Sequence, residues 1–73
     1  MTATRQMLTV DAVKRGVDEV GRLAPDDEAA HVAEDALYGN VLRAIADGIC
    51  EDARECARVA LKAQEIKFAR WCA

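Results

Sequence analysis

The longest regular alternation of apolar and polar positions lies between Pro25 and Gly48, and it predicts one helix over residues 26–47. Apolar residues recur there at helical spacing, at Ala30, Ala33, Leu37, Val41, Ala44 and Ile45. Tyr38 and Leu42 widen this face beyond what one neighbouring helix can cover, so the helix needs partners on two sides.

Local signals set both ends of this helix. Pro25 and the three acidic residues after it are typical of a helix start, and Gly48 can end the helix in the left-handed conformation. The pair Gly39-Asn40 is a weak point in the middle. The apolar phase nevertheless continues from Leu37 into Val41, which predicts a helix that runs through the pair.

A second helix is predicted over residues 9–24, with Thr9 as its N-cap and residues 1–8 as a flexible terminus. One narrow apolar stripe runs along it, formed by Val10, Val13, Val17, Val20 and Ala24. Pro25 ends this helix because the residue before a proline avoids the helical conformation. The next helix begins almost at once, so these two helices should pack antiparallel.

A third helix is predicted over residues 52–64, where Asp52 and Glu55 resemble a capping box. Its inward side is expected to consist of Ala53, Cys56, Ala57, Ala60, Leu61 and Gln64. Its outward side carries three basic residues four positions apart, Arg54, Arg58 and Lys62. Beyond it, Ile66 and Phe68 alternate with polar residues, a period of two rather than 3.6. Residues 65–73 are therefore expected to form an extended tail that lays Ile66, Phe68 and Trp71 over the helices.

These elements predict an all-α fold: a single domain over residues 1–73, built as a three-helix bundle with an apolar C-terminal tail packed on it. A chain of 73 residues buries only about 60% of the surface that its unfolded form exposes. Alanine is the commonest of its apolar residues, and it buries little area. A partner chain would enlarge so small a core, so both a monomer and a homo-oligomer are open.

The composition excludes some classes of function. The net charge is −3, which argues against a general nucleic-acid binder. The acidic stretch over residues 26–35 is interpreted as a helix N-terminus on a solvated face, with an acidic docking surface as the alternative. No segment approaches the ~18 apolar residues of a membrane helix, and residues 1–10 lack the apolar run of a signal peptide. We therefore expect a cytoplasmic protein that does not enter a membrane.

A cluster of four residues on the helix 26–47 is the strongest candidate for a site: His31, Glu34, Asp35 and Tyr38. Their spacing of three and four residues brings the side chains within reach of one another. A histidine beside carboxylates can act as a general base or metal ligand, but one helix face rarely builds a catalytic site alone. We therefore interpret the cluster as a hydrogen-bonded group that docks the C-terminal tail or a partner protein.

The cysteines Cys50, Cys56 and Cys72, together with His31, would formally make a zinc ligand set. Cys50 and Cys56 are separated by five residues, whereas structural zinc sites usually hold cysteines two to four residues apart. We therefore expect no metal or other cofactor, with Cys56 as a buried apolar side chain. Three reduced thiols also suit a cytoplasmic protein.

The region from Tyr38 to Lys62 has the outline of a helix-turn-helix, in which Arg54, Arg58 and Lys62 would face DNA. Glu51, Asp52 and Glu55 crowd the start of the would-be recognition helix and would repel phosphates. Nucleic acid is therefore an unlikely partner, and a DNA-binding regulator is the second hypothesis.

The C-terminal residues 68–73, together with residues 31–38 and 41–46, resemble small uncharacterised proteins encoded in phages and prophages of proteobacteria. The resemblance covers the last three fifths of the chain and includes no motif of known chemistry. It implies a phage or prophage origin. With the bundle architecture, it leads to the hypothesis of a non-enzymatic helical protein-interaction module, with Phe68 and Trp71 either packing the tail or binding the partner.

Overall fold

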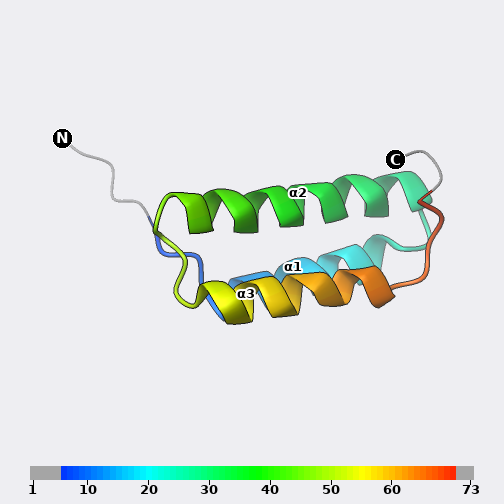
Figure 1. Cartoon of the computed structure of the whole chain (residues 1–73). Helices are drawn as coiled ribbons and strands as arrows, with labels where there is room; N and C mark the ends of the chain where they lie inside the picture. The colour runs from blue at the N-terminus through cyan, green and yellow to red at the C-terminus, as the bar shows by residue number, and fades with distance from the viewer. Residues whose placement is uncertain (1–5, 71–73) are drawn as a thin grey trace.

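The computed structural model describes residues 6–70 of the 73-residue chain. Three helices lie side by side and form the bundle shown in Figure 1: α1 (Val10–Leu23), α2 (Asp27–Ala46) and α3 (Ala53–Ala60). A short 3₁₀ helix, η1 (Leu61–Glu65), continues α3 without a break. The predicted all-α three-helix fold and its antiparallel first pair are thus confirmed, and α3 runs antiparallel to α2 and alongside α1.

Each of the three α-helices begins directly after a residue whose side chain accepts a hydrogen bond from the first turn. Thr9 Oγ1 accepts from the Ala12 amide at 3.1 Å, and Asp26 and Asp52 do the same for α2 and α3. Such caps satisfy amides that have no partner within the helix. At the other end of α2, Gly48 has a φ of +71°, the left-handed conformation expected for it. The helix α2 is continuous through Gly39-Asn40, as the apolar phase predicted.

The core lies where the three helices meet. Its buried residues are Val13, Val20, Ala30, Leu37, Val41, Cys56, Val59, Ala60 and Ala63. Within the described part of the chain, the one charged side chain buried with them is Glu34. Ile66 and Phe68 pack against this core from the tail, as expected, whereas Trp71 and Cys72 lie outside the described residues.

Three boundary predictions are wrong in detail. α3 ends at Ala60 rather than near residue 64, because its last turn tightens into 3₁₀ geometry, as helix ends often do. Glu55 does not complete a capping box: its side chain forms an ion pair with Arg58. Leu8 is not a loose end, because its amide donates to Ile49 O at 2.7 Å and its carbonyl accepts from the Glu51 amide at 2.8 Å.

The inward face of α3 also differs from the prediction. Leu61 is 54% exposed, Gln64 and Ala53 are exposed, and Val59 and Ala63 are buried in their place. The helix is rotated so that Val59, which has more apolar area than Ala57, packs against the core. This rotation leaves Leu61 at the surface beside α2.

Candidate functional site

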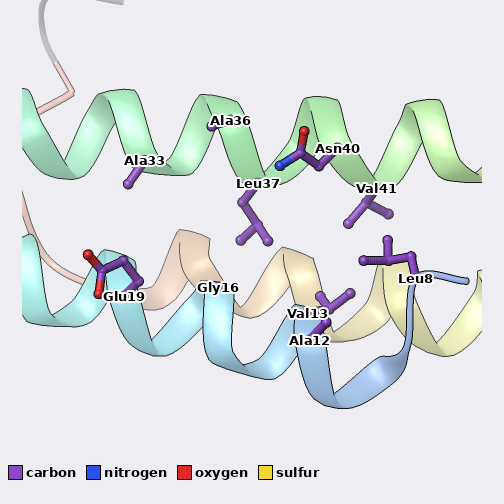
Figure 2. Close-up of a pocket in the computed structure, with 10 residues that line it drawn as sticks. All are labelled: Leu8, Ala12, Val13, Gly16, Glu19, Ala33, Ala36, Leu37, Asn40 and Val41. Carbon is purple, nitrogen blue, oxygen red and sulfur yellow. The ribbon is translucent and has the colours of Figure 1, made fainter. Parts of the chain in front are cut away.

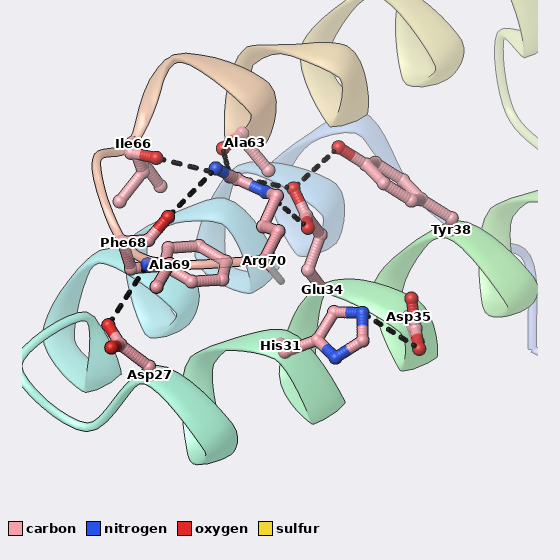
Figure 3. Close-up of polar contacts among 10 residues, drawn as sticks. All are labelled: Asp27, His31, Glu34, Asp35, Tyr38, Ala63, Ile66, Phe68, Ala69 and Arg70. Atoms are coloured by element: carbon pink, nitrogen blue, oxygen red, sulfur yellow. Dashed lines mark hydrogen bonds and ion pairs between the residues drawn. The ribbon is translucent and has the colours of Figure 1, made fainter. Parts of the chain in front are cut away.

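The candidate polar cluster centres on Glu34 of α2, which is 4% exposed. Its two carboxylate oxygens accept three hydrogen bonds from side chains (Figure 3). Arg70 Nε donates to Oε1 at 2.9 Å and Arg70 Nη2 donates to Oε2 at 3.0 Å, while the Tyr38 hydroxyl donates to Oε2 at 3.0 Å. The buried charge is therefore paired and hydrogen-bonded, which is the condition for burying a carboxylate.

Arg70 belongs to the tail and links it to two other parts of the molecule. Besides Glu34, its Nη2 donates to Ala63 O at 3.0 Å and to Ile66 O at 3.1 Å, both near the end of η1. Its guanidinium lies over the Phe68 ring, 3.9 Å from the ring centre. One side chain thus neutralises the buried acid of α2 and donates to two backbone carbonyls at the end of η1 (Figure 3).

The arrangement shifts two pKa values. The hydrogen bond from Arg70 holds the pKa of Glu34 below its usual range, against the opposing effect of burial. Burial, and then the hydrogen bond to Glu34, raise the pKa of Tyr38 to about 12. At neutral pH Glu34 is therefore ionised and Tyr38 is neutral. The Glu34 shift reflects its pairing with Arg70, and the Tyr38 shift reflects first its burial.

His31 and Asp35 lie beside this group but form a separate contact. His31 Nε2 is 3.6 Å from Asp35 Oδ2, and the Asp35 side chain is 69% exposed. Figure 3 shows this contact beside Glu34 on α2. The structure therefore divides the four predicted residues into a hydrogen-bonded pair, Glu34 and Tyr38, and a contact between His31, whose side chain is 16% exposed, and the exposed Asp35.

Arg70 is the member of the cluster that the sequence analysis missed. The residues singled out in the tail were Ile66, Phe68 and Trp71, because they are its large apolar residues. The available signal was Glu34 itself: a carboxylate within an apolar arc requires a cation, and Arg70 is the arginine of the tail. The Ala69 amide adds a second link between tail and bundle, donating to Asp27 Oδ1 at 3.1 Å.

The cysteines that the structure describes do not gather with His31. Cys56 is fully buried, and this burial raises the pKa of its thiol to about 11. The hydrogen bond between the Cys56 and Cys50 side chains is the second cause of the rise. Both thiols are free. Among residues 6–70 no three His, Cys, Asp or Glu side chains are placed to hold a metal ion. Cys72, the fourth member of the formal zinc set, is outside that range.

The three basic residues considered for DNA binding are all exposed, Arg54 and Arg58 on α3 and Lys62 on η1. Arg58 is engaged in the ion pair with Glu55. In Figure 1 α2 and α3 run side by side in opposite directions, whereas the helices of a helix-turn-helix cross at roughly 90–120°.

A second feature of the structure is an apolar groove between α2 and α3, with a volume of about 190 Å³. The residues that line it are Tyr38, Val41, Leu42, Ala57, Ala60 and Leu61. Leu42 and Leu61 stand on opposite sides of the groove and are 67% and 54% exposed. We call this surface the α2–α3 groove. The sequence analysis did not predict it, since both leucines were expected to be buried.

Another depression, of about 270 Å³, lies between α1 and α2 (Figure 2). Small residues of both helices form much of its wall, and Leu37 extends from α2 across to Gly16 of α1. Glu19 and Asn40 are the polar residues among those that line it. The leucines that line this depression are less exposed than Leu42 and Leu61. No cluster of polar groups points into it.

Among residues 6–70, no helix is long and apolar enough to cross a membrane. Comparison of the chain with protein-family models, curated proteins and solved structures gave no match.

Proposed function

We propose that this chain is a small, non-enzymatic protein-interaction module that binds a partner protein through the α2–α3 groove. The observation that carries the proposal is the exposure of Leu42 and Leu61 on the two sides of one apolar depression. Large aliphatic side chains at the border of a concave apolar surface are typical of docking sites. Burying them against a partner removes apolar area from water, which favours association.

The polar cluster supports a structural role. Glu34, Tyr38 and Arg70 satisfy one another, and the shifts move the pKa values of Glu34 and Tyr38 away from neutral pH. A general base or acid instead needs a pKa near the working pH and a reacting group within reach. A turnover activity that disappears in His31→Ala while the melting temperature stays the same would overturn the non-enzymatic assignment.

The resemblance of the last three fifths of the chain to small phage and prophage proteins supports a phage or prophage origin. It makes a phage or host protein the natural class of partner. A cytoplasmic location belongs to the same proposal and is supported by two free thiols, Cys50 and Cys56, in contact with one core.

The experiment is capture of partners from a lysate of the native host on immobilised chain, with mass-spectrometric identification. Leu42→Glu and Leu61→Glu place a charge on either side of the groove. Val32→Glu is the matched control, because Val32 is 64% exposed on α2 and does not line the groove. We expect a protein retained by the wild type and Val32→Glu but lost from both leucine variants, all four chains being equally helical. Equal retention by all four would contradict the proposal.

The DNA-binding alternative is tested with the same preparations. A non-specific duplex should bind a DNA-binding regulator with an affinity that falls steeply with salt, and replacing Arg54, Arg58 and Lys62 by alanine should abolish the binding. We expect no such binding, because α2 and α3 are side by side and Arg58 is paired with Glu55.

A further inference from the structure

The α2–α3 groove is bordered by the two large residues that the sequence pattern assigned to buried positions. Leu42 belongs to the wide apolar arc of α2, which required neighbours on two sides, and Leu61 was expected on the inward side of α3. In the single chain both remain largely exposed. The fold therefore leaves one part of the apolar pattern without a neighbour, and that part is continuous across two helices.

The two sides of the groove carry opposite charges. On α2, Glu28 and Asp35 precede Leu42 at intervals of seven residues, so all three lie along nearly the same line on the helix. On α3, Arg54 lies seven residues before Leu61, and Arg58 and Lys62 follow the neighbouring line. All five charged residues are exposed. Two acids of the α3–η1 segment lie near these basic residues: Glu55 is ion-paired with Arg58, and Glu65 lies beyond Lys62.

This arrangement of opposite charges favours one kind of partner. A partner helix of one charge sign would be attracted by one side of the groove and repelled by the other. A second copy of the same chain, rotated about a two-fold axis along the groove, places its α3 against α2 of the first copy. The acidic side then meets the basic side twice, and Leu42 meets Leu61 twice, as an isologous interface requires. A two-fold axis across the groove would instead place acidic side against acidic side.

We propose that a second copy of this chain covers the α2–α3 groove and forms a symmetric dimer. This inference rests on the proposed function, because it takes the groove as the docking surface and names its occupant. The antiparallel course of the helices decides which residues of the two copies face each other. Asp35 lies one turn before Tyr38 in α2, and Lys62 directly follows Leu61 in η1. Asp35 and Lys62 are therefore at the end of the groove that is nearer the tail. Asp35 of one copy therefore lies opposite Lys62 of the other.

The size of the face sets the expected affinity. The face is as long as its shorter side, in which the eight residues of α3 at ~1.5 Å and the five of η1 at ~2.0 Å span about 22 Å, while two helices make it about 20 Å wide, or roughly 440 Å² when flat. A standard interface buries about 800 Å² on each partner. A rough surface buries more than its flat area, so the dimer is at the small end of stable interfaces. We expect a dissociation constant on the order of micromolar.

The test is sedimentation equilibrium of the purified full chain over a concentration series up to about 500 μM, which spans a micromolar constant. We expect a reversible monomer–dimer equilibrium for the wild type and for Val32→Glu. Leu42→Glu and Leu61→Glu should each raise the dissociation constant at least ~10-fold, since central apolar contacts dominate such interfaces. Circular dichroism of each variant checks that the helices remain.

Charge reversal tests the two-fold arrangement separately. Asp35→Lys should weaken the dimer, and the double variant Asp35→Lys/Lys62→Glu should restore it, because the opposite charges again face each other. Failure of this restoration overturns the arrangement. The dimer is overturned if the wild type stays monomeric over the whole series. It is also overturned if the two leucine variants dimerise as well as the wild type does, or if Val32→Glu abolishes dimerisation. A monomeric wild type whose capture of another protein still depends on Leu42 overturns this inference and leaves the proposed function standing.

Discussion

At the scale of single residues, Glu34 is the side chain on which the arrangement of the tail depends. A buried carboxylate is costly unless opposite charge and hydrogen bonds compensate it. Arg70 and Tyr38 supply both, and no buried side-chain nitrogen or oxygen in residues 6–70 lacks a partner. The carboxylate therefore selects one position for the tail: the position in which Arg70 reaches it.

Replacing Glu34 with alanine should destabilise the fold by about 1–3 kcal/mol, because Arg70 and Tyr38 lose their shared acceptor in a partly buried site. Glu19→Ala is the matched control. Glu19 also accepts from an arginine, Arg22, but their side chains are 48% and 67% exposed, so the loss should be much smaller than that of Glu34→Ala. Urea unfolding of the two variants measures the difference, and equal small losses would mean that the buried pair contributes no net stability.

Tyr38 offers a direct reading of the cluster, because it is the single tyrosine of the chain. Ultraviolet titration should report its pKa at about 12 rather than at the ordinary value of about 10. Since the folded pKa is raised, the contribution of Tyr38 to stability is present below the ordinary value and is lost as the pH rises through the folded one. Glu34→Ala should lower the titration midpoint, because it removes the acceptor of the phenol proton. A midpoint near 10 in folded wild-type protein, checked by circular dichroism, would contradict the described contact.

At the scale of helices, the approach of α1 to α2 depends on Gly16. A Cβ at this position would lie 2.6 Å from Leu37 Cδ1, so either Leu37 or the helix would have to move. Gly21 differs, because a Cβ there would lie 3.8 Å from Ile66 Cδ1, an ordinary contact. The same substitution therefore has two structural consequences in one helix.

Gly21→Ala should stabilise the protein by about 0.5–1 kcal/mol, which is the usual gain from replacing a helical glycine. Gly16→Ala gains the same helix propensity but should be no more stable than the wild type, since displacing packed side chains typically costs about 1–3 kcal/mol. Thermal melting of both variants is the measurement. Equal stabilisation by the two would show that the contact between Gly16 and Leu37 is not tight.

The tail is the other element whose packing can be measured. Deleting residues 66–73 removes the Arg70 contacts and the apolar contacts of Ile66 and Phe68 with the core. The loss should exceed that of Arg70→Ala and reach about 3 kcal/mol or more, because large apolar side chains are removed together with the ion pair. An unchanged melting temperature would mean that the tail packing is not needed for stability, and Phe68 would then be available to a partner.

At the scale of the whole molecule, the small core connects stability to assembly. Within the described part of the chain its buried residues are mostly alanine and valine, and two leucines remain outside it. A dimer through the α2–α3 groove would enlarge the apolar area that this sequence buries. Association that favours the folded chain also raises its stability by mass action.

The melting temperature of the wild type should therefore rise with protein concentration, whereas that of Leu42→Glu should not. The melting temperatures are compared by circular dichroism at two protein concentrations about 100-fold apart. Over this range mass action contributes up to ~2.7 kcal/mol for the binding of a second chain. Val32→Glu should follow the wild type. A melting temperature independent of concentration in the wild type would contradict a dimer that stabilises the fold.

The sequence by itself determined the helices and most of their ends. Thr9, Asp26, Asp52 and Gly48 act through contacts that span only a few residues, so the chain near each of them is sufficient to predict the end. The apolar phase likewise predicted that α2 is continuous through Gly39-Asn40. Those features are local, and they persist whatever packs against them.

Tertiary structure alone decided which distant groups meet. Arg70 and Glu34 are 36 residues apart, and Val10 and Glu51, whose side chain accepts from the Val10 amide, are 41 apart. The spacing of a sequence carries no information about such pairs, because they depend on how the helices rotate and pack. The same rotation buries Val59 and leaves Leu61 exposed. The apolar pattern of the sequence determined which helix faces carry leucine. The packing of the helices decided which of these leucines stay at the surface, because a small bundle has too little interior to bury them all.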